Sequence, residues 1–114
     1  RLVLGAAVLL GLAAGAQDFA VVGYVPEYRF DGLDWDHVLK STTHVVLFSI
    51  EPTADGGLTG VERLESLLRP NSPFRHAVKA AGSSRPKILV SLGGAGRSQH
   101  FAAAAGSKQT RRAL

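Results

Sequence analysis

Three short runs of apolar and β-branched residues restrict what this chain can fold into more than any other feature. They cover residues 19–25, 43–50 and 87–92, and each is followed by a proline, a loop-forming stretch or a pair of glycines. This length and composition predict three strands. The middle run is apolar almost throughout, which is typical of a strand covered on both faces in a parallel sheet.

Helical spacing of apolar residues predicts helices between and after these strands. Asp34 can cap the first helix, in which Trp35 and Leu39 lie on one side. Ser98 is predicted to cap the last helix. The helices after the first are expected over residues 61–68, 74–81 and 101–105. Alternating strands and helices predict a parallel α/β fold, in which right-handed crossovers place the three strands side by side.

Residues 2–16, LVLGAAVLLGLAAGA, carry no charge and no hydrogen-bonding side chain. This segment is shorter than the ~20 residues that a membrane-spanning helix needs. With the preceding Arg1 and a small-x-small pattern at Ala14 to Ala16, it predicts a secretory signal peptide over residues 1–16 whose start is missing. We therefore expect a secreted mature chain, residues 17–114, without membrane association. A buried Ala/Leu helix or a shortened membrane anchor are the alternatives.

The basic residues gather after Gly56, where ten Lys and Arg stand against two acids. They are dispersed singly, with one adjacent pair and no accompanying aromatic residues, so we expect a solvated helical surface and no nucleic-acid partner. The chain has no Cys, and its four His are scattered. This pattern predicts neither a disulfide framework nor a metal site, and no cofactor is expected.

Chemically unusual residues lie where the three predicted strands end, the place where parallel α/β folds bind ligands. These residues are Tyr24, Pro26, Ser49, Glu51, Ser91, Gly93 and Gly94. Taken alone, Tyr24 reads as a core aromatic, and the paired glycines read as an ordinary strand exit.

The segment from Lys87 to Gly94 resembles the K-x-x-x-S-x-G-G signature of family 18 glycoside hydrolases, the chitinases and chitinase-like lectins. Residues 22–26 are similar to the first barrel strand of that family, and residues 43–49 to its second. The resemblance covers about residues 20–101. It implies an incomplete (β/α)8 TIM barrel of which this chain holds only the first three βα units, since a complete barrel needs about 250 residues.

The resemblance implies hydrolysis of chitin or other β-1,4-linked N-acetylglucosamine polymers, in which the N-acetyl group of the substrate acts as nucleophile. The family places its acids in D-x-x-D-x-D-x-E on the fourth strand, beyond the end of this chain. The string from Asp31 to Val38 imitates this motif, but it precedes the second strand and has valine at the acid position. We therefore expect no catalytic residue in this chain. The alternatives are a non-catalytic lectin on the same barrel and a nucleotide-binding domain that uses the loop after Gly93.

Five substrate-binding residues are implied by the resemblance. Tyr24 would hold the N-acetyl group, Ser91 would join the network beneath the catalytic acids, and Gly93 and Gly94 would let the backbone approach the sugar. Phe48 is implied as well, although its place is shifted by one residue from the family pattern.

That shift has a structural consequence, because a one-residue slip moves a side chain to the other face of a strand. Phe48 is therefore expected to face the helices, with Ser49 directed inward. Ala95 replaces the tryptophan that often follows the paired glycines in the family, and this removes a stacking surface.

Overall fold

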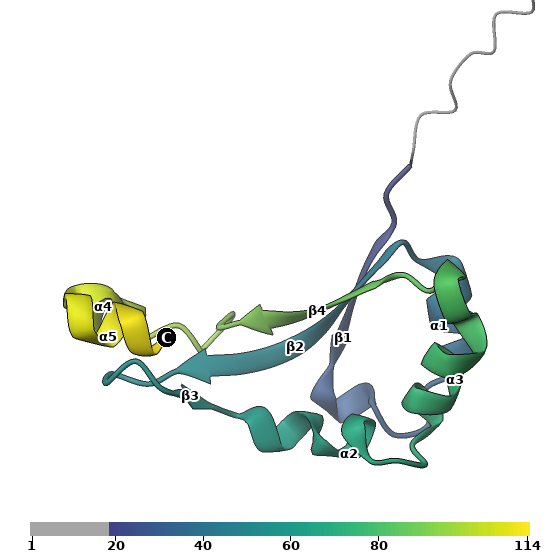
Figure 1. Ribbon diagram of the computed structural model, residues 1–114, viewed down its shortest axis with the longest axis horizontal. Helices are drawn as coiled ribbons and strands as arrows, with labels where there is room; N and C mark the ends of the chain where they lie inside the picture. The colour runs from purple at the N-terminus through teal and green to yellow at the C-terminus, as the bar shows by residue number, and fades with distance from the viewer. Residues whose placement is uncertain (1–18) are drawn as a thin grey trace, which may run out of the picture.

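The structure, a computed structural model, describes residues 19–114; the predicted signal peptide, residues 1–16, lies outside the described residues. Three parallel strands form the centre of an open mixed α/β fold (Figure 1). They are β1 (Val22–Pro26), β2 (His44–Pro52) and β4 (Lys87–Leu92), and β2 lies between the other two. The predicted order and direction of the three strands are confirmed. A short strand that the sequence did not predict, β3 (Leu58–Thr59), pairs antiparallel with the end of β2.

Within residues 19–114, five α-helices and three 3-10 turns connect and follow the strands. The α-helices are α1 (Trp35–Ser41), α2 (Glu65–Leu68), α3 (Pro73–Ala81), α4 (Phe101–Gly106) and α5 (Lys108–Ala113). The 3-10 turns are η1 (Glu27–Arg29), η2 (Val61–Leu64) and η3 (Gly82–Ser84). The single helix predicted over residues 61–68 is thus divided into η2 and α2, and the first strand begins at Val22, where its pairing with β2 begins.

Side-chain caps explain where three of the described helices begin: α1, α3 and α5, the last of which is capped by Ser107. The Asp34 carboxylate accepts a hydrogen bond from the backbone N–H of His37 at 3.0 Å, which confirms it as the cap of α1. Ser72 caps α3 in the same way through the N–H of Arg75. The prediction that Ser98 caps α4 is wrong. Its hydroxyl instead accepts from the N–H of Gly94 and donates to the carbonyl of Gly94, and α4 begins only after His100.

The register of the sheet separates its side chains into two faces, because paired residues on neighbouring strands point to the same side. One face, here called the covered face, carries Val25, Val45 and Leu47, which pack into the core together with α1 and α3. The other, here called the open face, carries a row of residues from all three strands: Val22, Tyr24, Val46, Phe48, Leu89 and Ser91.

Aromatic side chains from the helical layer hold the core together. Trp35, which is 3% exposed, lies with its ring centroid 4.8 Å from that of Phe74 in an edge-on contact and 6.1 Å from that of Phe30. Leu39 and Ala77 continue the same cluster towards the covered face of the sheet. The core therefore lies between the sheet and the pair α1 and α3 (Figure 1).

Much of the open face and of the two outer strands is exposed within residues 19–114, although Val46 on the middle strand is buried. Within that range β1 and β4 pair only with β2, so each leaves one edge without a neighbour. Tyr24 is 68% exposed and Leu89 is 46% exposed. In the described part of the chain, no helix is both long enough and apolar enough to cross a membrane.

Candidate functional site

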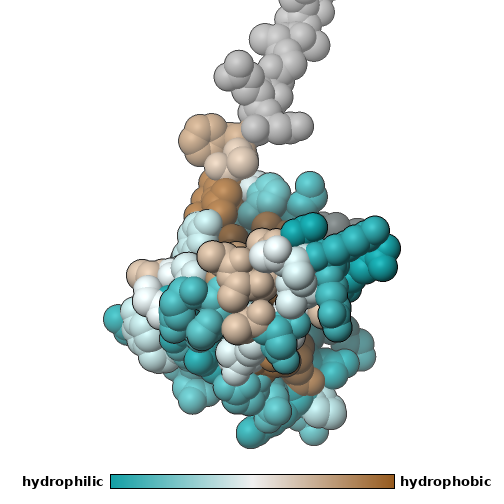
Figure 2. Space-filling model, turned by 90° about the vertical axis from the view of Figure 1, so that its left-hand side faces the viewer, coloured by the Kyte–Doolittle hydropathy of each residue, from teal (hydrophilic) through white to brown (hydrophobic). Residues whose placement is uncertain are grey.

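The carboxyl ends of β1, β2 and β4 meet at one end of the sheet, together with the loop from β4 to α4. We call this place the carboxyl rim and define it by the side chains and glycines that line it. They are Glu27, Phe48, Ser49, Glu51, Arg63, Ser91, Gly93, Gly94 and Arg97. Figure 2 looks at the molecule from the α4 and α5 side and shows a largely hydrophilic surface, with apolar atoms near the top and in smaller patches at the centre and lower right.

Arg97 joins the ends of two strands through one guanidinium group. Its Nη2 donates a hydrogen bond to the carboxylate of Glu27, and its Nη1 donates to the hydroxyl of Ser49 at 3.1 Å. The guanidinium carbon lies 5.2 Å from the centre of the Phe48 ring, which is within cation–π range. Its Nε is 3.8 Å from the carboxylate of Glu51. The loop after β4 is thereby tied to β2 and to the end of β1.

A second arginine completes the charge balance of the carboxyl rim. Arg63 donates from Nη1 to the Glu51 carboxylate at 2.7 Å and to the backbone carbonyl of Ser49 at 3.3 Å. Two arginines thus face two glutamates, and the cluster has no net charge. A second oxygen of Glu27, Oε2, is buried and has no hydrogen-bond partner among the described residues. The rim is therefore polar but not a strong anion or cation site.

The ion pair between Glu27 and Arg97 shifts the pKa of both side chains. The hydrogen bond from Arg97 lowers the pKa of Glu27, against the opposing effect of burial, and the nearby Arg63 lowers it slightly further. The same hydrogen bond raises the pKa of Arg97. Glu27 is accordingly ionised at neutral pH, and it is not a proton donor.

This shift predicts how stability depends on pH. Because the Glu27 pKa is lower in the folded chain than in the unfolded chain, the pair stabilises the fold above the usual glutamate pKa of about 4.3. Its contribution is lost as the pH falls through the folded value. In urea titrations between pH 7 and pH 2, we expect the unfolding free energy of the unmodified chain to fall more steeply than that of Glu27→Gln. Parallel curves for the two proteins would contradict the assignment.

The structure brings Phe48, Ser91 and Gly94 together. Phe48 pairs with Ser91 across the sheet, and the Phe48 ring lies where a Cβ on Gly94 would be, so only glycine fits there. The Ser91 hydroxyl is 3.5 Å from the carbonyl of Gly93. Gly93 itself is buried against the ring of Phe101. Four of the five residues implied by the sequence therefore share the carboxyl rim.

Tyr24 lies on the open face, one row back from the carboxyl rim. It pairs with Val46, whereas the next row on that face is Pro26, Phe48 and Ser91. At 68% exposure it is not a core residue of the described part of the chain.

The expectation that Phe48 faces the helices is wrong. The shift in register between β2 and β4 lies between Phe48 and Ile50, so Phe48 keeps the alternation of the earlier residues and shares the open face with Tyr24. Ser49 is fully buried, and its hydroxyl accepts a hydrogen bond from Arg97.

Sequence reasoning missed three charged residues of the carboxyl rim. Glu27 directly follows the first strand, so the rule that identified Glu51 at the second strand end could have found it. Arg97 lies in a glycine-rich loop between a strand and a helix, which is a second usable signal. Nothing in the local pattern distinguishes Arg63 from other surface arginines.

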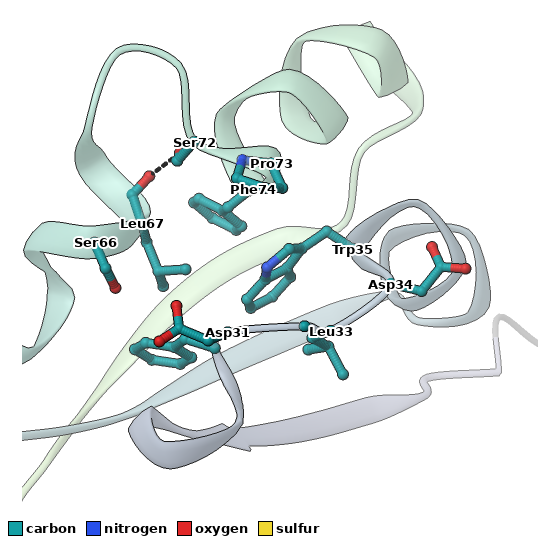
Figure 3. A pocket seen from close by; sticks show the side chains of 11 residues that line it. Asp31, Leu33, Asp34, Trp35, Ser66, Leu67, Ser72, Pro73 and Phe74 are labelled. Atoms are coloured by element: carbon teal, nitrogen blue, oxygen red, sulfur yellow. Dashed lines mark hydrogen bonds between the residues drawn. The ribbon is translucent and has the colours of Figure 1, made fainter.

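A cavity of about 310 Å³ lies on the helical side, between the loop before α1 and the segment that leads into α3 (Figure 3). Asp31 and Asp34, from the string that imitates the family's acidic motif, form part of its wall. The Asp34 carboxylate caps α1, and the Ser72 hydroxyl donates to the carbonyl of Leu67 and caps α3. These polar atoms serve the helix ends, which agrees with the prediction that the string is a loop followed by a helix cap.

Three backbone N–H groups of the glycine loop after β4 are engaged within the chain, whereas a phosphate cradle needs free N–H groups at a helix start. The N–H of Gly93 donates to Ile50 at 2.7 Å, and that of Gly94 donates to Ser98 at 3.0 Å. The N–H of Arg97 is also taken, by the carbonyl of Gly94. These engaged donors disfavour the nucleotide-binding alternative.

Comparisons with protein-family models, with curated proteins and with solved structures give no match for this chain. Among residues 19–114, no group of three or more His, Asp or Glu is placed to hold a metal ion. The carboxyl rim and the open face are therefore the features that indicate a function for this chain.

Proposed function

We propose that this chain is the saccharide-binding, N-terminal part of a secreted chitinase-like protein of glycoside hydrolase family 18. In this proposal it supplies the first three βα units of a (β/α)8 barrel. Further strands would pair with the free edges of β1 and β4, and they would turn the open face into the inside of the barrel. The ligand would be chitin or another β-1,4-linked N-acetylglucosamine oligosaccharide.

The single observation that carries the proposal is the shared placement of Tyr24, Phe48 and Ser91. All three lie on the open face, at or next to the carboxyl ends of parallel strands, where α/β folds bind their ligands. Gly94 has no Cβ, so the Phe48 ring can pack directly against the loop after β4. An exposed tyrosine and a serine hydroxyl on the same face of the sheet suit a sugar, which presents both apolar faces and hydroxyl groups.

The charge balance of the carboxyl rim supports an uncharged ligand. Arg97 and Arg63 are already paired with Glu27 and Glu51, so a phosphate or a uronic acid would have to break an existing ion pair. A neutral N-acetylated sugar needs only hydrogen bonds and stacking. This agrees with a chitin-type ligand and not with an acidic polysaccharide.

Hydrolysis would need an acid that this chain does not contribute. Glu27 has a lowered pKa, so it would not protonate a leaving oxygen at neutral pH. No D-x-x-D-x-D-x-E string follows the third strand in the 114 residues. We therefore infer that these residues bind saccharide without cleaving it. Whether the complete barrel is a hydrolase or a lectin then depends on the last residue of that motif: glutamate permits hydrolysis, and any other residue leaves binding alone.

Titration of N-acetylglucosamine trimer into the 114-residue chain, followed by backbone NMR, tests the proposal. We expect shifts at Tyr24, Ser91 and Gly94, and we expect Tyr24→Ala to weaken binding about tenfold by removing the exposed ring. A chromogenic chitobioside should show no turnover.

Tyr28→Ala is the matched control for that titration. Tyr28 is 77% exposed but lies on η1, outside the row formed by Tyr24 and its neighbours. The Tyr28→Ala chain should bind N-acetylglucosamine trimer with the same affinity as the unmodified chain. The absence of shifts at the carboxyl rim, or equal losses in both variants, would reject the proposal, and measurable turnover would reject the inference that these residues only bind.

A further inference from the structure

The loop between β4 and α4 reaches across the molecule through one residue. Arg97 contacts Glu27, which lies 70 positions earlier in the chain, and Ser49, which lies 48 positions earlier. Two of these three side chains are partly exposed and Ser49 is fully buried. Long-range bonds from one side chain restrict a loop much more than bonds to its own neighbours, because they fix its position relative to the sheet.

The same loop also has a tight internal turn. The Ser98 hydroxyl binds both the N–H and the carbonyl of Gly94 at 3.0 Å, and the N–H of Arg97 donates to that carbonyl. The turn sets the direction in which Arg97 leaves the loop, and it places Gly94 against the Phe48 ring. The ring is therefore in contact with the loop twice, through Gly94 and through the guanidinium of Arg97.

We propose that Arg97 is a positioning residue that holds this loop and the Phe48 ring in place on the carboxyl rim before a saccharide binds. The loop-holding step follows from the contacts of Arg97 alone, whereas its effect on saccharide affinity rests on the proposed function. A loop that is already ordered loses less conformational entropy on binding, so the ligand is bound more tightly without any contact to Arg97 itself.

An arginine is required at this position for geometric reasons. Its planar group presents separate donors to the Glu27 carboxylate and to the Ser49 hydroxyl, while its face lies over the Phe48 ring. A lysine would supply the charge from a single point and could not serve all three partners. The conservative variant Arg97→Lys is therefore expected to keep only part of the effect.

Peptide-level hydrogen exchange on the 114-residue chain measures the loop directly. We expect Arg97→Gln to raise exchange across residues 93–100 about tenfold, since a hydrogen bond to a charged group is lost. Arg97→Lys should give an intermediate value. Arg85→Gln is the control: the Arg85 guanidinium donates a hydrogen bond to the backbone carbonyl of Gly82, and Arg85 precedes β4, outside the loop. In the Arg85→Gln chain, the hydrogen-exchange rate across residues 93–100 should stay within about twofold of that in the unmodified chain.

A double-mutant cycle identifies the partner. If Glu27 and Arg97 act as a pair, Arg97→Gln should change loop exchange much less in the Glu27→Gln background than in the unmodified chain. A general loss of stability would instead give additive effects and faster exchange in the core around Trp35.

Saccharide affinity provides the second measurement. Arg97→Gln should weaken binding of N-acetylglucosamine trimer about tenfold, while Arg85→Gln should not change it. Unchanged loop exchange in Arg97→Gln, or additive effects in the cycle, would overturn the positioning role even if saccharide binds. Raised loop exchange in Arg97→Gln, together with no trimer binding by the unmodified chain, would support the positioning role and reject the proposed function.

Discussion

Trp35→Ala should lower the free energy of unfolding by about 3–5 kcal/mol, as expected when a large buried aromatic side chain is truncated. Trp35 is 3% exposed and contacts the rings of Phe30 and Phe74, so it joins the loop after β1, α1 and α3 in one cluster. Single domains are stabilised by only about 5–15 kcal/mol, so this loss is a large part of the total. Urea unfolding followed by circular dichroism would measure it.

Tyr28→Ala serves as the control for that measurement. Tyr28 is an aromatic residue of the same region, but it is 77% exposed and contacts only the guanidinium of Arg29 among the described aromatic and cationic pairs. Its removal should change the unfolding free energy by no more than about 0.5 kcal/mol. If Trp35→Ala were as mild as Tyr28→Ala, the helical layer would not be packed on the sheet as described.

The parallel fold could be predicted from sequence because its signals are local. Each of the three strands is a run of apolar residues, and Asp34 marks the start of α1 by its own hydrogen bond. The order of strands and helices then leaves few possible topologies. The two-residue strand β3 was missed because it has no periodicity to detect and depends on β2 for its pairing.

The side-chain arrangement of the carboxyl rim was less predictable. The side of the sheet on which Phe48 lies depends on where the register shifts, and that position is set by pairing with β4, about 40 residues away. Serine is a common helix-cap residue, yet Ser98 binds Gly94 because the loop folds back on itself. In both cases the local sequence allows two arrangements, and only the tertiary structure decides between them.

The Glu27–Arg97 pair is the clearest example of a contact that only the tertiary structure determines. The two residues are 70 positions apart, and no pattern in the sequence links them. A carboxylate at the end of one strand and an arginine in a glycine-rich loop are each common features. Only the placement of β1 next to β2, and of β4 on the other side of β2, brings them within reach of one another. The strand order was predictable, but the ion pair that depends on it was not.

Gly94→Ala should be strongly destabilising for so small a substitution on the carboxyl rim, with an expected loss of about 3 kcal/mol in unfolding free energy. Two costs of about 1–3 kcal/mol each combine there. One is a backbone φ of 129°, which residues other than glycine rarely adopt, and the other is overlap of the new Cβ with the Phe48 ring. The ring must move or the loop must open, so binding of N-acetylglucosamine trimer should also weaken.

Gly96→Ala separates the two costs because it lies in the same loop. Gly96 also has a positive φ, 70°, but nothing lies within 4 Å of the position that its Cβ would occupy. It should therefore lose only about 1–2 kcal/mol, from backbone strain alone, and saccharide affinity should be little changed. Equal losses in the two alanine variants would mean that the contact between Gly94 and Phe48 does not constrain the loop. A larger loss in Gly94→Ala that is partly restored by Phe48→Leu would instead identify the ring as the group that requires glycine at this position.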